Sequence, residues 1–159
     1  MTSNSFRKIT LFLLSVIIAA LAQRNTGYDH DFVRGTIFPL CAAAYSDTPT
    51  DCLKAVDPKA EKVQKFTVTC GGANTCSGYT ALLHSHKAIV LAFRGSKTIT
   101  QFLKIAWMTL TESRCRWKAD TGQVATYFCD AFIKIWDRGL KENLKQLIED
   151  NRDYRVWVR

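Results

Sequence analysis

Two apolar segments joined by a short polar connection constrain the fold more than any other part of the sequence. The segments are Gly78–Leu83 and Ala88–Phe93, and His84-Ser85-His86-Lys87 connects them. A polar connection of this length between apolar segments is typical of a β-hairpin. The second segment is apolar at every position, so we expect it to be buried on both faces in the middle of a sheet.

The flanking segments carry helix and strand signals. The spacing of apolar residues predicts an amphipathic helix over 38–45, followed by a break at 47–50 and a short helical turn or loop at 52–58. From Lys65 to Cys70 polar and apolar residues alternate, which predicts a half-buried strand.

After the hairpin, residues 99–110 are expected to form a helix or a mobile segment. Residues 122–151 are expected to form a long amphipathic helix with a kink or a close packing contact at Gly139. Residues 156–158 begin a strand. The succession of strand, hairpin, long helix and strand predicts an α/β fold with a mixed sheet.

The first 22 residues have the pattern of a cleaved secretory signal peptide. Arg7 and Lys8 are basic, residues 9–19 are mostly apolar, and Ala20-Leu21-Ala22 fits the small-x-small cleavage pattern. The alternative is an uncleaved anchor, but the apolar stretch is shorter than the roughly 20 residues that a membrane-spanning helix needs. We therefore expect a secreted protein with a mature domain over 23–159.

The formal net charge of +8 leaves the partner open among several classes. Export argues against nucleic acid, and the basic residues are spread along the chain, which favours a solvated surface. Attraction to an anionic lipid interface is the alternative.

An even number of cysteines in an exported chain indicates disulfides. Six cysteines allow many connectivities, and short intervening loops favour pairing in sequential order. That order joins Cys41 with Cys52, Cys70 with Cys76, and Cys115 with Cys129. A zinc site is the competing interpretation, but the chain has no Cys-x-x-Cys pair and its histidines (His30, His84, His86) lack ligand spacing. We expect no metal and no cofactor.

Phe93-Arg94-Gly95-Ser96 is the segment best suited to chemistry. A buried strand that ends in Gly-Ser places a hydroxyl and a backbone N–H at the carboxyl end of a sheet, where α/β folds bind ligands. These donors can stabilise an oxyanion. The alternative is an ordinary turn that glycine eases. His84-Ser85-His86 also pairs a hydroxyl with a base, but its place in a hairpin connection favours a solvated turn.

The order of these segments resembles class 3 (fungal-type) lipases over about residues 33–158. The resemblance comprises the hairpin, the apolar strand, Phe93-Arg94-Gly95-Ser96, a helical segment, Tyr127–Phe132, the long helix and Tyr154–Val158. Many members have Val-His-x-Gly-Phe where this chain has Val124-Ala125-Thr126-Tyr127-Phe128, which is a local departure.

The resemblance implies an α/β-hydrolase fold and hydrolysis of acylglycerol esters, with Ser96 as the oxyanion-hole residue. In that family, the strand that corresponds to 154–158 leads into a Gly-x-Ser-x-Gly nucleophile elbow. No serine stands two positions after any of the eight glycines here. We therefore expect an incomplete α/β-hydrolase-like fold that ends before the elbow, with no catalytic-triad residue and no esterase activity of its own.

Three interpretations of function follow. The first is a lipase-family product with a lipid or ester substrate, of which this chain is a shortened form. The second is a secreted, non-catalytic, disulfide-bonded binding module, and the third is an inactive fragment. Because 154–158 lacks the partners that it has in the family sheet, we also expect self-association through this unfinished sheet.

Overall fold

A computed structural model describes residues 28–71, 74–111, 113–116 and 122–159. The signal peptide expected over 1–22 lies outside the described residues. The helices are α2 (His30–Phe32), η1 (Val33–Ile37), α3 (Phe38–Ala43), α4 (Pro49–Val56), η2 (His84–His86), α5 (Ile99–Thr111), α6 (Thr126–Ile135), η3 (Trp136–Leu140) and α7 (Lys141–Asp150). The strands are β1 (Glu61–Thr69), β2 (Thr75–Leu83), β3 (Ala88–Phe93), β4 (Arg114–Arg116), β5 (Gln123–Ala125) and β6 (Arg155–Val158).

The main sheet is mixed, as the segment order predicts. Its strand order is β1-β2-β3-β6; the first two pairs are antiparallel, and β3 and β6 are parallel. Strand β3 lies between β2 and β6, and residues 88–92 are all buried. The prediction of a central strand buried on both faces is therefore confirmed.

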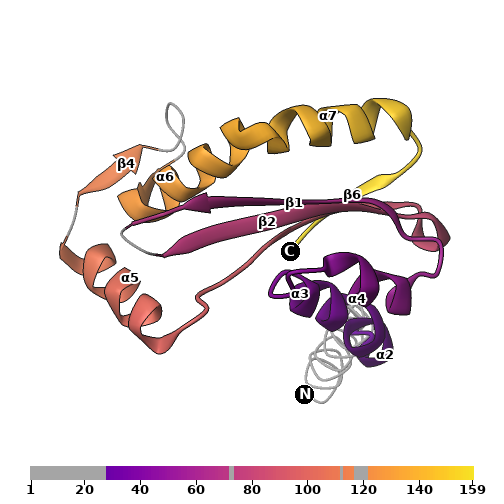
Figure 1. Cartoon of the computed structure of the whole chain (residues 1–159), viewed down its shortest axis with the longest axis horizontal. Helices are drawn as coiled ribbons and strands as arrows, with labels where there is room; N and C mark the ends of the chain where they lie inside the picture. The colour runs from indigo at the N-terminus through magenta and orange to yellow at the C-terminus, as the bar shows by residue number, and fades with distance from the viewer. Residues whose placement is uncertain (1–27, 72–73, 112, 117–121) are drawn as a thin grey trace, which may run out of the picture.

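Helices cover both faces of this sheet (Figure 1). On the side of α3 and α4, Leu40 and Leu53 pack with Tyr79 and Val90. The Tyr79 hydroxyl donates to the Leu40 carbonyl at 2.8 Å, and burial raises the pKa of this phenol. The opposite face packs against α6, η3 and α7 through a second apolar cluster (Leu82, Ile89, Leu91, Ile135, Leu140, Leu144, Leu147).

The long C-terminal helix is interrupted at Gly139, as predicted. This residue has φ +114°, a conformation that a side chain disfavours, and a Cβ here would lie 3.6 Å from the Phe66 ring. The helix begins at Thr126 rather than at 122, because residues 123–125 pair with β4 as strand β5. Cross-strand pairing outside the local pattern decides this boundary.

The N-terminal helical region is longer than the sequence pattern predicts. It begins at His30, where the Asp29 carboxylate caps the first turn by accepting from Phe32 N at 2.9 Å. It continues through η1 into α3. Pro49 begins α4, where the backbone N–H that proline lacks would have no intrahelical partner. Residues 44–48 therefore separate α3 from α4, and the break predicted over 47–50 is wrong for residues 49 and 50, which are helical.

Two of the three predicted disulfides are present. Cys70 is joined to Cys76, and Cys115 to Cys129. The predicted Cys41–Cys52 bridge is absent, and both residues are free thiols. Cys41 is exposed on α3, whereas Cys52 packs partly against the core on α4, so the two side chains lie in different environments. Within the described residues, no helix is long and apolar enough to cross a membrane.

Candidate functional site

The site forms where the chain leaves strand β3. Arg94 N donates to the Ser77 carbonyl on β2 at 2.8 Å, and Phe93 N donates to the Arg159 carbonyl at 2.8 Å. The turn that follows holds Gly95 and the half-buried Ser96. It thus starts beside the carboxyl ends of the parallel strands β3 and β6, which is where α/β sheets bind ligands.

Gly95 leaves room for the side chain of Tyr45. A Cβ at this position would lie 2.6 Å from the Tyr45 hydroxyl oxygen, so the end of the Tyr45 side chain would have to shift. Tyr45 follows α3, so the Gly95 contact joins the N-terminal helices to the turn. Among the described residues, the Ser96 hydroxyl makes no hydrogen bond and is free to donate to a ligand.

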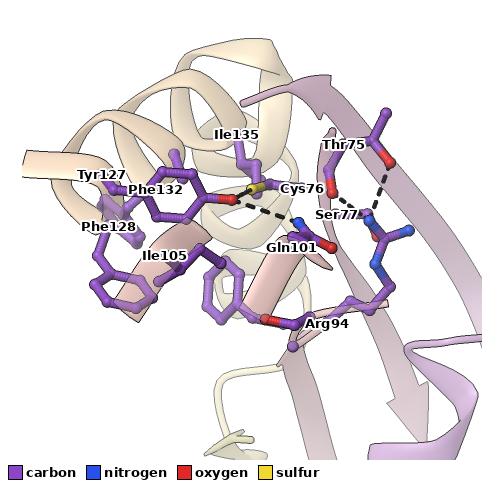
Figure 2. A pocket seen from close by; sticks show the side chains of 14 residues that line it. Thr75, Cys76, Ser77, Arg94, Gln101, Ile105, Tyr127, Phe128, Phe132 and Ile135 are labelled. Atoms are coloured by element: carbon purple, nitrogen blue, oxygen red, sulfur yellow. Dashed lines mark hydrogen bonds between the residues drawn. The ribbon is translucent and has the colours of Figure 1, made fainter. Parts of the chain in front are cut away.

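A cavity of about 250 Å³ opens beside this turn, and Ser96 is one of its lining residues. Its apolar wall comes from β3, α5 and α6 and includes Phe93. Figure 2 shows three further residues of this wall, Ile105, Phe132 and Ile135. A cavity with this lining can hold an aliphatic chain.

The other wall of the cavity is polar. Thr75, Ser77 and Arg94 gather on one side of the view in Figure 2. An Arg94 Nη2 proton is donated to the Thr75 carbonyl, and Nη2 also lies 3.0 Å from Thr75 Oγ1. The cavity is therefore amphipathic.

Gln101 and Tyr127 connect the turn to the Cys70–Cys76 disulfide. Gln101 is buried; its Oε1 accepts from Lys97 N at 2.8 Å, and its Nε2 donates to the Tyr127 hydroxyl at 3.4 Å. The same hydroxyl lies 3.2 Å and 3.3 Å from the sulfurs of Cys70 and Cys76. The sequence pattern did not single out Gln101, because its partner is 26 residues away on another helix.

Helix α5 presents an apolar surface to solvent. Between 59% and 83% of each of these residues is exposed: Ile99, Phe102, Leu103, Trp107 and Leu110. Large apolar side chains gathered on one helix and left uncovered mark an interaction surface.

The other predicted site residues lie far from the cavity. Ser85 donates its hydroxyl to the buried carboxylate of Asp57 at 2.8 Å, and not to the imidazole of His84 or His86. His84 bridges Glu61 at 2.9 Å and the Tyr154 hydroxyl at 2.5 Å. The connection is a turn, but His84 is only partly exposed, and it links Glu61 of β1 to Tyr154, which precedes β6. Among the described residues, no group of His, Cys, Asp or Glu is placed to hold a metal ion.

The part of the chain that contains the Ser96 turn and most of the cavity lining is similar to known lipases. Residues 90–159 match the family model of class 3 lipases. Residues 90–159 form part of a class 3 lipase-like domain. The matched part of this domain contains Arg94, Gly95 and Ser96, the Gln101–Tyr127 contact and strand β6.

Individual relatives of the lipase-like domain are longer than this chain. It is 31% identical over 159 residues to lipase ZK262.3 of Caenorhabditis elegans, a match that covers 96% of this chain and 43% of that protein. The chain thus spans less than half the length of its curated relative.

Solved structures share the fold of the lipase-like domain. The Rhizomucor miehei triacylglyceride lipase matches with a TM-score of 0.59 and 20% identity, over 80% of this chain and 48% of that one. The mono- and diacylglycerol lipase of Aspergillus oryzae matches with a TM-score of 0.57 and 20% identity, over 77% of this chain and 48% of that one. The described strands and helices therefore form part of an α/β-hydrolase fold.

Proposed function

We propose that the whole protein hydrolyses acylglycerol esters, with Ser96 in the oxyanion hole and the neighbouring cavity around the acyl chain. The observation that carries this proposal is the position of Ser96, whose unpaired hydroxyl lines the amphipathic cavity at the carboxyl end of β3. In acyl transfer, a hydroxyl and a backbone N–H aimed at the developing negative charge lower the barrier. These two donors lower the barrier only if they are held in place before the reaction. The contact of Tyr45 with Gly95 and the hydrogen bond of Gln101 with Lys97 both restrain the turn that carries Ser96.

The exposed face of α5 supports a substrate that gathers at a lipid surface. Five large apolar side chains on one helix lose water contact when they enter a lipid interface, which is favourable by about 25 cal/mol per Å². Without residues 1–22, which contain Arg7 and Lys8 but no acid, the formal net charge falls from +8 to +6, and this charge adds attraction to anionic lipid. We infer that α5 is the element that docks on lipid.

Export is part of the same proposal. The two disulfides are of the kind that persists in an oxidising compartment, and the pattern of residues 1–22 favours a signal peptide. The Cys70–Cys76 disulfide, of which Cys76 lines the cavity, also fits an enzyme that works outside the cell.

A non-catalytic lipid-binding module is the second candidate. The 159 residues contain no Gly-x-Ser-x-Gly elbow, whereas the cavity and the α5 face are both present. An oxyanion hole without a nucleophile and its base contributes little turnover, so these residues by themselves are expected to bind lipid without cleaving it.

The test is hydrolysis of dioctanoylglycerol by the protein expressed from its complete coding sequence. Loss of one oxyanion donor typically lowers kcat by about 100- to 1000-fold, and we expect this for Ser96→Ala. Ser113→Ala is the matched control, because Ser113 lies outside the cavity lining. No hydrolysis by the unchanged protein, together with saturable binding of the same lipid, would favour the non-catalytic module instead.

A further inference from the structure

The polar wall of the cavity contains two buried polar atoms with no partner. They are Ser77 Oγ and Arg94 Nε. Ser77 is only 1% exposed, so water does not replace the missing partner from bulk solvent. Buried polar atoms in folded proteins are nearly always hydrogen-bonded, and those that are not call for a ligand or another explanation. Both atoms belong to residues that line the same cavity.

The two residues are held side by side by the sheet. Arg94 N donates to the Ser77 carbonyl, so the side chains leave neighbouring strands at the same level. Thr75, two residues before Ser77 on β2, accepts from the Arg94 guanidinium through its carbonyl and its hydroxyl. The positive group is therefore fixed at the cavity wall by neutral oxygens.

Arg94 has no carboxylate partner. None of the ion pairs among the described residues includes it. Arg94 contributes to the electrostatic environment of Asp47, but the ion-pair partner of Asp47 is Lys65 at 3.2 Å. Hydrogen bonding and charge from Lys65, then the charges of Lys97 and Arg94, hold the pKa of Asp47 below its usual range. Among the residues that line the cavity, Arg94 alone carries a charge, so no acid in the lining offsets its positive charge.

The opposite wall accepts an aliphatic chain. Phe93, Ile105, Phe132 and Ile135 supply apolar surface, and the volume is about 250 Å³. For comparison, an apolar protein cavity of roughly 150 Å³ is large enough for benzene. A ligand that satisfies both walls carries a negative head and a single apolar chain.

We propose that this cavity binds an anionic amphiphile, with its head at Arg94 and Ser77 and its chain against Phe93 and Phe132. A fatty carboxylate and a phosphate monoester of a fatty alcohol share this chemistry. Binding of an anionic amphiphile does not require that the protein hydrolyses esters. Only one source of the ligand rests on the proposed function, because cleavage of an ester would release a fatty carboxylate.

Isothermal titration calorimetry with octanoate, octyl phosphate and 1-octanol tests the proposal on the protein expressed from its complete coding sequence. Octanoate or octyl phosphate is expected to bind about tenfold or more tightly than 1-octanol, because only the anions pair with the guanidinium. Tighter binding of octanoate than of octyl phosphate identifies the carboxylate source, and the reverse identifies the phosphate source.

Substitutions then locate the head. Arg94→Gln is expected to weaken anion binding by about tenfold and to leave 1-octanol binding unchanged, whereas Arg94→Lys keeps part of the preference. Arg152→Gln is the matched control, an exposed arginine outside the cavity lining. Equal binding of octanol and both anions, or equal loss of all three in Arg94→Gln and Arg94→Lys, would overturn the proposal. Dioctanoylglycerol hydrolysis is measured separately, so an inactive protein that still prefers the anions refutes only the proposed function.

Discussion

Asp57 is the residue on which the hairpin connection depends. It is fully buried, and its carboxylate accepts from Lys59 N at 2.9 Å, from Ser85 N at 2.8 Å and from Ser85 Oγ at 2.8 Å. Burial alone would raise the pKa of Asp57, but the hydrogen bonds from Ser85 and Lys59 outweigh it and hold this pKa below its usual range. The folded state therefore favours the ionised form of the Asp57 carboxyl group more than the unfolded state does.

Asp57→Asn is expected to lower the free energy of unfolding by about 2 to 3 kcal/mol at neutral pH, because a charged acceptor of buried hydrogen bonds is lost. A lowered pKa stabilises the fold above the unfolded-state pKa of about 4, and that contribution disappears as pH falls through the folded value. The difference between the two proteins should thus shrink in acid. Urea unfolding followed at several pH values measures it.

The matched control is Asp153→Asn, since Asp153 is an exposed acid whose hydrogen bond to Lys87 is at the surface. Its effect should be much smaller than that of Asp57→Asn. Equal effects of the two substitutions would contradict a special role for the buried carboxylate.

Helix α5 is the element that links the site to lipid. Gln101 anchors it to α6 through Tyr127, and its exposed apolar residues are left for an external surface. Replacing Trp107 and Leu110 by alanine is expected to weaken binding to vesicles with anionic lipid by about tenfold or more, since each residue buries apolar area at the interface. Vesicle sedimentation measures the partition, and circular dichroism shows whether the fold is kept.

Ile148→Ala on α7 is the control for this surface, because Ile148 is also apolar and exposed but lies on another helix. An equal loss in Ile148→Ala, or no loss in the Trp107 and Leu110 variant, would show that α5 is not the docking element.

At the scale of the whole molecule, the sheet has an uncovered edge within the described residues. Strand β6 pairs with β3 alone, and 41% of Val156 and 56% of Val158 is exposed. Free N–H and C=O groups along an apolar edge are a template for pairing with another chain, and charged residues on the strand oppose it. Arg155 is the charged residue inside β6.

We expect the 159-residue chain to self-associate at micromolar concentration through β6. Val158→Lys should shift sedimentation velocity toward the monomer, because a charge on an edge strand disfavours pairing. Ile148→Lys is the control, since it adds the same charge on α7. A single monomeric species of the unchanged chain would show that this edge does not pair.

Local sequence determined much of this protein. Alternating and continuous apolar segments predicted β1, β2 and β3, helical spacing predicted α6 and α7, and Gly139 marked the interruption between them. These predictions succeed because a period of two or of 3.6 residues specifies which face is buried, whatever the rest of the chain does. The place of Ser96 after a buried strand was visible for the same reason.

Tertiary structure decided the remainder. Ser85 contacts Asp57 across 28 residues of sequence, and Arg94 reaches Thr75 across 19, so no local pattern announces the buried carboxylate or the polar wall of the cavity. Cys41 and Cys52 are close in sequence, yet α3 leaves one thiol exposed while α4 packs the other against the core. Burial and pairing depend on which segments meet in space, and that is settled only when the helices close over the sheet.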